Sequence, residues 1–256
     1  MQPREHTLAA APRLPGEQPE QGTGADSSHP NNSSTPQPMT AATKQELMRR
    51  PITALWLTPL IALPYALAGR VEPRPVLWLT PGPLENWIPV ETHLAPWIYI
   101  SFYGLLYLSG LLLTAPRFRR YVLTLVVTSL LSVLAFLLLP SGVPRDSVDP
   151  DSASALYRWL VEIDPPRNAF PSEHASLSFV ALLALSTGKH PRWLKCAAWI
   201  WFLLIYWSTI ATRQHVLIDL ATGAALGAAC WWWAGRRLSV AKRDGARTFP
   251  PSRNPR

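Results

Sequence analysis

The chain has 256 residues, 48% of them hydrophobic, and its formal net charge at pH 7 is +8. This length allows one or two ordinary domains, and this apolar content excludes a chain that is disordered throughout. The two cysteines, Cys196 and Cys230, both lie inside apolar segments, which excludes a disulfide framework and a cysteine-based zinc motif.

Residues 1–48 are rich in Pro, Gln, Ser, Thr, Asn and Ala and have no apolar periodicity. Such a segment buries too little apolar surface to offset the entropy that it would lose on ordering. We therefore expect residues 1–48 to form a disordered cytoplasmic tail. The composition of this tail does not indicate a function for it.

Six later segments approach or reach the roughly 20 apolar residues that a helix needs to cross a bilayer. They span residues 52–69, 97–115, 121–140, 170–188, 193–212 and 216–235. Many of the 12 tryptophans lie near segment ends, as in interfacial belts. Gly223 and Gly227 have the spacing that allows close helix packing. We expect an all-α fold, an integral membrane six-helix bundle over residues 49–237, rather than a soluble bundle of unusually apolar helices.

Lysine and arginine gather before the first segment, between the second and third, between the fourth and fifth, and in a basic tail over residues 238–256. In a chain that crosses six times, these regions lie on one side, which the positive-inside rule makes cytoplasmic. We expect both termini in the cytoplasm and the protein in the cytoplasmic (plasma) membrane. The first segment ends in ALAGR, but its polar lead is too long for a signal peptide, so we expect an uncleaved anchor. Charge beside membrane segments attracts anionic lipid, so we expect membrane lipid and no nucleic acid as a partner.

Two histidines begin apolar segments at the extracytoplasmic face, His174 in the fourth and His215 in the sixth. Either histidine alone is equally well explained by interfacial water. Asp219 stands four residues after His215, so on a helix the two side chains share a face, and a carboxylate inside an apolar segment needs a partner. A carboxylate that holds one imidazole nitrogen leaves the other free to act as a nucleophile or base.

Basic and hydroxyl groups accompany the two histidines. Arg167 precedes His174 by seven residues, Arg213 precedes His215 by two, and Ser172 stands close to a helix start. Together they describe a pocket for an oxyanion such as phosphate. Two histidines and a carboxylate also fit a metal site, but an arginine beside each histidine repels a divalent cation. We therefore expect no metal and no cofactor.

The stretches FPSEHASLS and STIATRQHVLIDLATG resemble the second and third signature motifs of the type-2 phosphatidic acid phosphatase superfamily, which also contains vanadium-dependent haloperoxidases. The resemblance covers about residues 139–235 by motif and all six segments by number. It implies that His215 is a nucleophile that forms a phosphohistidine and that Asp219 orients it. It also implies that His174 is the general acid for the leaving group and that Ser172 binds phosphoryl oxygens.

The motifs depart from the family pattern at three places. Glu173 occupies the position of the usual glycine in the second motif. Ser208 and Thr209 stand where the third motif usually has Ser-Arg, so Arg213 is the candidate that replaces this arginine. The first motif, a lysine and an Arg-Pro at a fixed spacing, is not found.

These changes resemble the branch with the patterns NAFPS.H and QH...D, which includes inositol phosphorylceramide synthase; Asn168 and Gln214 would support the site. We expect a lipid-phosphate phosphatase, a phosphoric ester hydrolase that acts at the extracytoplasmic face. One alternative is a lipid phosphotransferase in which an alcohol acceptor replaces water. Another is a non-catalytic membrane protein, such as a transporter with a His and Asp proton pathway. The head group, the chain type and the oligomeric state leave no readable trace in the sequence.

Overall fold

The structure is a computed structural model that describes residues 41–71, 75–149, 151–164 and 166–248. Residues 1–40 of the predicted N-terminal tail and residues 249–256 of the predicted basic tail lie outside this range. Within it the chain is mostly helical, as predicted. The first helix begins at Ala41 and the last ends at Thr248, so helical backbone continues across residues 48 and 237. The division into domains at those residues stays a prediction.

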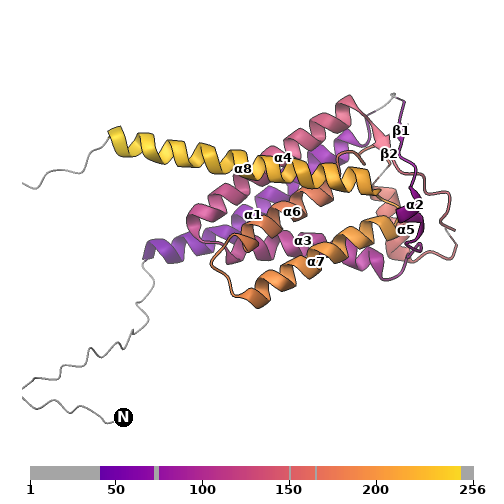
Figure 1. Cartoon of the computed structure of the whole chain (residues 1–256), viewed down its shortest axis with the longest axis horizontal. Coiled ribbons are helices and arrows are strands. Elements are labelled where there is room, and N and C mark those ends of the chain that lie inside the picture. The colour runs from indigo at the N-terminus through magenta and orange to yellow at the C-terminus, as the bar shows by residue number, and fades with distance from the viewer. Residues whose placement is uncertain (1–40, 72–74, 150, 165, 249–256) are drawn as a thin grey trace, which may run out of the picture. The chain divides into compact units, whose positions relative to one another are not determined.

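Six helices correspond to the six predicted apolar segments. They are α1 (Ala41–Ala68), α3 (Ala95–Leu112), α4 (Ala115–Leu138), α6 (Glu173–Ser186), α7 (Arg192–Ala211) and α8 (Leu217–Thr248). The sequence analysis did not predict four shorter elements in the connections, which are β1 (Leu77–Trp78), α2 (Pro83–Asn86), β2 (Ser141–Gly142) and α5 (Ala155–Ile163). Figure 1 shows these short elements gathered at the end of the bundle where α8 begins.

Four of the described helices are long and apolar enough to cross a membrane, namely α1 from Arg49 to Ala68, α3, α4 and α7. α6 is apolar but has only 14 residues, fewer than the roughly 17 to 25 that usually span a bilayer. Large apolar side chains are exposed on the outside of the bundle, among them Trp56 on α1, Leu138 on α4 and Ile200 on α7. Extended apolar surface of this kind is compatible with a membrane protein. Insertion and the number of crossings stay predictions.

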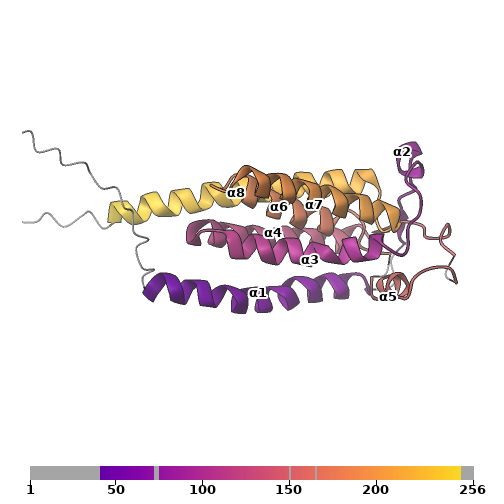
Figure 2. The same ribbon diagram turned by 90° about the horizontal axis from the view of Figure 1, so that it is seen from below.

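α6 lies at the centre of the bundle. It packs against α3, α4, α7 and α8. The extensive contacts of α1, in contrast, are with α3 and α4. Figure 2 shows this layering, with α1 on one side of α3 and α4 and with α6, α7 and α8 on the other. Leu177, Val180 and Leu182 of α6 are fully or almost fully buried, as expected for a helix that is apolar all round. This burial fixes the position of the first residues of α6 relative to the helices around it.

α8 approaches α6 closely because glycine lines the contact. A Cβ at Gly227 would lie 2.5 Å from the carbonyl oxygen of Ser176, and one at Gly223 would clash with the carbonyl oxygen of Ser172. A larger residue at either position would push the two helices apart. The close contact at these glycines is the packing that the spacing of Gly223 and Gly227 predicts. The contact continues to the ends of the helices, where Ser172 N–H donates to Asp219 O at 3.0 Å.

Ser141 holds together the connections that lead into α6. It pairs with Leu77 in the parallel pair of β1 and β2, and its N–H donates to Arg167 O at 3.2 Å. Ala169 N–H donates to Ser141 O at 2.9 Å, and Phe170 N–H donates to Ser141 Oγ at 2.9 Å. These hydrogen bonds fix the chain immediately before α6, and so position the start of that helix.

Arginines tie the helices together at the opposite end of the bundle. Arg50 on α1 donates to the carbonyl oxygens of Leu111 at 3.2 Å and Leu113 at 2.5 Å, at the end of α3. Arg120 on α4 donates to Trp231 O on α8 from both Nε and Nη2, at 3.1 and 2.6 Å. The side of the membrane on which this arginine-rich end lies stays a prediction.

Candidate active site

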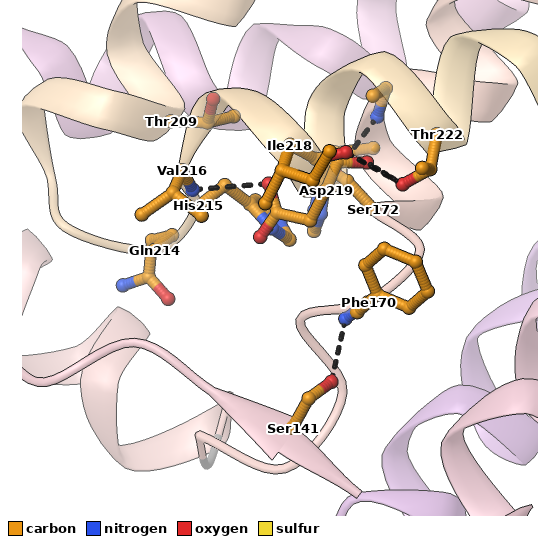
Figure 3. A network of polar contacts seen from close by, with 12 residues as sticks. Ser141, Phe170, Ser172, Thr209, Gln214, His215, Val216, Ile218, Asp219 and Thr222 are labelled. Carbon is orange, nitrogen blue, oxygen red and sulfur yellow. Dashed lines mark hydrogen bonds and ion pairs between the residues drawn. The ribbon is translucent and has the colours of Figure 1, made fainter. Parts of the chain in front are cut away.

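His215 and Asp219 form a buried hydrogen-bonded pair at the start of α8, which Figure 3 shows from close by. His215 Nδ1 lies 3.1 Å from Asp219 Oδ2, and Val216 N–H donates to Asp219 Oδ1 at 3.0 Å. His215 is 3% exposed and Asp219 is fully buried. An ionised carboxylate can only accept, so Nδ1 carries the imidazole proton and Nε2 carries the lone pair. The contact is the one that the spacing of the two residues predicts.

His215 lies in the turn before α8 and not on the helix, which differs from the sequence analysis. α8 begins at Leu217 because two carboxylates accept hydrogen bonds at its start. Asp219 accepts from Val216 N–H, and Glu85 Oε1 accepts from Leu217 N–H at 2.9 Å. Such carboxylates satisfy N–H groups that have no partner within the helix, and they favour its dipole. Glu85 belongs to α2 and is 132 residues away from Leu217 in the chain, so no local motif reveals it.

Arg213 forms the turn between α7 and α8. Its φ is 53°, in the left-handed region that few residues other than glycine adopt. Its side chain is buried, and Nη1 and Nη2 donate to the carbonyl oxygens of Glu85 and Ile88, each at 3.3 Å. The guanidinium that we predicted to bind phosphate therefore lies against α2, and its Nε has no hydrogen-bond partner among the described residues.

His174 lies at the start of α6, opposite His215. The two ring centroids are 5.7 Å apart. Tyr99 and Phe102 of α3 pack against the His174 ring, with centroid distances of 4.5 and 4.9 Å. The structure thus brings together the two imidazoles that the sequence analysis placed at one face of the membrane.

The remaining predicted residues lie on the approach to α6. Ser172 is the N-cap of this helix, and its Oγ accepts from Ala175 N–H at 3.2 Å, which leaves the hydroxyl proton for a ligand. Asn168 is 4% exposed, and its Nδ2 has no hydrogen-bond partner among the described residues. Arg167 Nη1 donates to Val71 O at 3.4 Å, beside the end of α1. Ser172 is therefore part of the helix start that carries His174, whereas this contact of Arg167 is directed towards α1.

Arg145 is a cation at the site that no sequence motif marked. Both of its terminal nitrogens donate to Asp164 O at 3.1 Å, and Nη2 also donates to Gln214 Oε1. Gln214 immediately precedes His215, is buried, and has an Nε2 without a hydrogen-bond partner among the described residues. Arg145 therefore brings positive charge next to the turn that carries His215.

Asp164, at the end of α5, is a second residue that sequence reasoning missed. Tyr65 O–H donates to Asp164 Oδ1 at 2.8 Å, and Tyr99 O–H donates to Asp164 Oδ2 at 3.0 Å. The oxygen of Tyr99 also lies 3.3 Å from His174 Nδ1. These partners are up to 99 residues apart in the chain, and no spacing rule connects residues at such separations.

α5, which carries Asp164, is fixed to the turn before α8. Tyr157 O–H donates to Thr212 O at 3.2 Å. Burial raises the pKa of Tyr157, so this hydroxyl keeps its proton near neutral pH. At the start of α5, Ser154 Oγ accepts from Tyr157 N–H at 3.1 Å and donates to Thr92 O. These contacts hold Asp164 at a fixed place, where Tyr99 links it to His174.

Glu173, the residue in the usual glycine position, is 4% exposed. Neither of its carboxylate oxygens has a hydrogen-bond partner among the described residues, although Ser129 of α4 faces it. A buried carboxylate without a partner lowers the stability of a fold, and polar groups of this kind concentrate at functional sites.

A pocket of about 80 Å³ starts at His174 and Glu173 and continues between α1, α3 and α4. Apolar side chains such as Leu106 and Leu125 line most of it, and Arg50 lines its far end. The pocket therefore joins the polar site at the start of α6 to the apolar interior of the bundle.

The described residues contain no group of three or more His, Cys, Asp or Glu side chains with the geometry to hold a metal ion. A carboxylate supports each imidazole instead, directly for His215 and through a tyrosine for His174. With the guanidinium of Arg145 and the hydroxyl of Ser172 nearby, this set of groups fits an anionic phosphoryl group.

A search of curated proteins finds no match. The family model described as the PAP2 superfamily matches residues 77–233, a range that begins at β1, ends within α8 and contains both histidines and Asp219. The match covers more than half of the 256 residues. The chain therefore belongs to the PAP2 superfamily, the type-2 phosphatidic acid phosphatases whose second and third motifs its sequence resembles.

Proposed function

We propose that the protein is an integral membrane phosphatase that cleaves a lipid phosphate through a phosphohistidine intermediate. Membership of the PAP2 superfamily supports a phosphatase-type enzyme, a hydrolase or a phosphotransferase. The observation that carries the proposal is the ring separation of 5.7 Å between His174 and His215, with Asp219 on Nδ1 of His215. A nucleophile and an acid on two sides of one phosphoryl group are what in-line transfer requires.

In the first step, the Nε2 lone pair of His215 attacks phosphorus, and the bond between phosphorus and the lipid oxygen breaks. The leaving oxygen takes the Nε2 proton of protonated His174 and becomes the hydroxyl of a lipid alcohol. Asp219 keeps its hydrogen bond to Nδ1 and stabilises the positive charge that develops on His215.

In the second step, water attacks phosphorus from the side of His174. His174, now neutral, takes a proton from this water as the bond between phosphorus and His215 Nε2 breaks. Inorganic phosphate leaves, and both imidazoles return to their starting protonation states, so the cycle consumes one water and one lipid phosphate.

Phosphate binding is assigned to Ser172, Arg167 and Arg213, the residues indicated by the sequence, and to Arg145. Buried donors without an acceptor among the described residues support this assignment, and they are Arg145 Nε, Asn168 Nδ2, Arg213 Nε and Gln214 Nε2. Buried donors are normally hydrogen-bonded, and phosphoryl oxygens are acceptors that can satisfy several of them. Asn168 and Gln214 thereby support the site.

The lipid nature of the substrate rests on the pocket and on the surface of the bundle. The pocket runs from His174 along apolar side chains, so a phosphate at the histidines can have its hydrocarbon chain between α1, α3 and α4. The exposed apolar side chains and the four long apolar helices support a site in the bilayer. With the positive-inside rule, the predicted six crossings put both termini in the cytoplasm and the histidines at the extracytoplasmic face of the plasma membrane.

The test uses the full chain in detergent with a long-chain phosphatidic acid as the substrate. We expect release of inorganic phosphate and a labelled enzyme intermediate that is stable in base and labile in acid, as phosphohistidine is. His215→Ala abolishes both signals, whereas His190→Ala, in the connection between α6 and α7, leaves them unchanged. Unchanged turnover in His215→Ala would remove the assigned nucleophile, and a wild-type protein without turnover would favour a non-catalytic membrane protein.

A phosphotransferase of the inositol phosphorylceramide synthase type is the second candidate, and Glu173 favours it. A carboxylate without a partner beside His174 can accept a hydrogen bond from the hydroxyl of an acceptor alcohol in the pocket. The two candidates differ in the product formed when an alcohol is added. Phosphate release without an alcohol supports hydrolysis. Formation of an alkyl phosphate monoester from phosphatidic acid and a long-chain alcohol, with the lipid alcohol released and the signal lost in Glu173→Gln, supports transfer.

A further inference from the structure

Asp164 binds the hydroxyl groups of two tyrosines beside His174. Tyr65 O–H donates to Oδ1 at 2.8 Å and Tyr99 O–H donates to Oδ2 at 3.0 Å. The carboxylate is 8% exposed and stands at the end of α5, whereas the tyrosines come from α1 and α3. Three separate segments of the chain therefore meet at one buried carboxylate, next to the proposed general acid.

The number of protons in this cluster fixes the direction of its hydrogen bonds. The oxygen of Tyr99 lies 3.3 Å from Nδ1 of His174. A phenol has a single O–H proton, and Tyr99 gives it to Asp164, so towards His174 its oxygen can only accept. His174 therefore carries a proton on Nδ1, and the nitrogen that exchanges a proton with a ligand is Nε2.

Aromatic rings hold the imidazole in this orientation. The Tyr99 ring is tilted against it at a centroid distance of 4.5 Å, and Phe102 lies at 4.9 Å. Tyr65 is perpendicular to it at 6.0 Å. Side chains packed on several sides leave a ring few rotamers, so the hydrogen bond to Tyr99 and the packing act in the same direction.

We propose that Asp164, acting through Tyr99, is a positioning residue for His174. It holds the proton on Nδ1, leaves Nε2 available to the ligand, and stabilises the ring when it is positively charged. The proposal rests on the proposed function, in which the Nε2–H bond of His174 breaks as the lipid O–H bond forms. The Nδ1 proton stays on His174 throughout, and the electron pair of the broken P–O bond stays on the lipid oxygen.

Arg145 connects this relay to the other histidine. Its terminal nitrogens bind the main-chain oxygen of Asp164, and Nη2 also binds Gln214 Oε1, next to His215. The main chain of Asp164 is further fixed by its N–H, which donates to Leu160 O at 2.9 Å. The carboxylate of Asp164 is thus free to face the tyrosines, and its position is tied to the turn that carries the nucleophile.

The first experiment reads the tautomer of His174 directly, by NMR of the full chain labelled with ¹⁵N-histidine in detergent. His174→Gln assigns the signals. A neutral histidine side chain in water favours the proton on Nε2, so a neutral His174 with its proton on Nδ1 reports an imposed hydrogen bond. We expect Nδ1–H in the wild type and a shift to Nε2–H in Tyr99→Phe. Nε2–H in the wild type, or no change in Tyr99→Phe, would overturn the relay.

The second experiment uses the leaving group to separate positioning of an acid from a general structural role. A long-chain alkyl phosphate needs its leaving oxygen protonated, whereas p-nitrophenyl phosphate has a leaving group that needs little help. We expect Tyr99→Phe and Asp164→Asn to slow the pre-steady-state phosphorylation step about 10- to 100-fold with the alkyl phosphate. With p-nitrophenyl phosphate the same step changes less than about threefold. Tyr206→Phe on α7 is the matched control, because its hydroxyl donates to Ala175 O at 3.3 Å and not to Asp164, and it changes little with either substrate.

The outcomes separate this inference from the proposed function. Equal losses with both substrates, together with lower thermal stability, would mean that Asp164 and Tyr99 only support the fold. If His174 carries the proton on Nδ1 but neither substrate forms a phosphoenzyme, the proposed function is wrong and the relay stands. If phosphoenzyme forms and depends on His215 but His174 has the other tautomer, the relay is wrong and the proposed function stands.

Discussion

The two histidines have the same hydrogen-bonding pattern, but the fold builds it in two different ways. His215 donates from Nδ1 to a carboxylate four residues away, at 3.1 Å, within a single turn of chain. His174 reaches its carboxylate through a tyrosine, over 3.3 and 3.0 Å, with partners from α3 and α5. A pair within one turn forms wherever α8 forms, whereas a relay between three segments exists only when the whole end of the bundle is assembled.

This difference corresponds to the two chemical roles. A nucleophile must carry a positive charge while it is bonded to phosphorus, and a direct carboxylate stabilises that charge most strongly. An acid must give its proton away again, and a neutral phenol between ring and carboxylate weakens the attraction for the proton. The arrangement therefore suits His215 to bond formation and His174 to proton exchange.

The largest expected effect tests this difference directly. Asp219→Asn replaces an acceptor by an amide that can hold the wrong tautomer of His215, so kcat falls about 10³- to 10⁴-fold with phosphatidic acid. Asp164→Asn acts only through Tyr99, and kcat falls about 10- to 100-fold. Steady-state phosphate release measures both, with the exposed loop variant Asp151→Asn as the control. Equal losses in the two variants would remove the distinction between direct and relayed support.

Arg145 joins the two halves of the site, and its replacement tests whether they act together. Arg145→Lys keeps the charge but loses the fork that reaches Asp164 and Gln214 at once. We expect activity to fall about 10²-fold and inhibition by inorganic phosphate to weaken. Arg158→Lys, on α5, is the control. If Arg145→Lys keeps full activity, the simultaneous hydrogen bonds of Arg145 to Asp164 and Gln214 do not contribute to catalysis.

The parts of the site that the sequence predicts are those made by neighbours in the chain. Asp219 follows His215 by four residues, and the apolar runs predict the six helices that carry the site residues. The second and third motifs also indicate which residues meet, because the fold of a family supplies the long-range contact between His174 and His215.

The parts that the sequence did not predict are made by residues far apart in the chain. Asp164 meets Arg145 across 19 residues and Tyr99 across 65. Arg145 meets Gln214 across 69 residues, and Glu85 caps α8 across 132. A charged residue in a loop has the same appearance whether it is solvated or buried against another segment. α2 and the two short strands are too short to have a periodic pattern, and the nine residues of α5 lie in a connection between the apolar segments. The positions of these elements and the residues they carry depend on tertiary contacts.

A third prediction concerns the contact that keeps the two histidines opposite each other. Gly227→Ala puts a methyl group against the carbonyl oxygen of Ser176 and pushes α8 away from α6. We expect the free energy of unfolding to fall by about 1 to 3 kcal/mol, with a moderate loss of activity as the rings separate. Ala225→Leu, on the exposed face of α8, is the control, and thermal denaturation in detergent measures both variants. Equal stability of Gly227→Ala and the wild type would mean that the helices shift without loss.

The smallest expected effect lies at the start of α3, the helix that carries Tyr99. Glu91 accepts hydrogen bonds from the N–H groups of His93 at 2.9 Å, Leu94 at 2.8 Å and Ala95. Burial alone would raise the pKa of Glu91, but these three donors hold it below its ordinary value. Glu91→Gln therefore lowers the free energy of unfolding by about 0.5 to 1 kcal/mol at neutral pH.

The pH dependence of this effect has a definite sign. A carboxyl group with a lowered pKa in the folded state contributes its full stability above its unfolded pKa, and loses it as the pH falls through the folded value. The difference in Tm between wild type and Glu91→Gln is therefore constant from neutral pH down to the ordinary carboxyl range and vanishes below it. Because Tyr99 follows Ala95 by one helical turn, relayed support of His174 weakens in Glu91→Gln while the pair of His215 and Asp219 does not. A tautomer change at His215 in this variant, or a Tm difference that grows as the pH falls, would contradict this account.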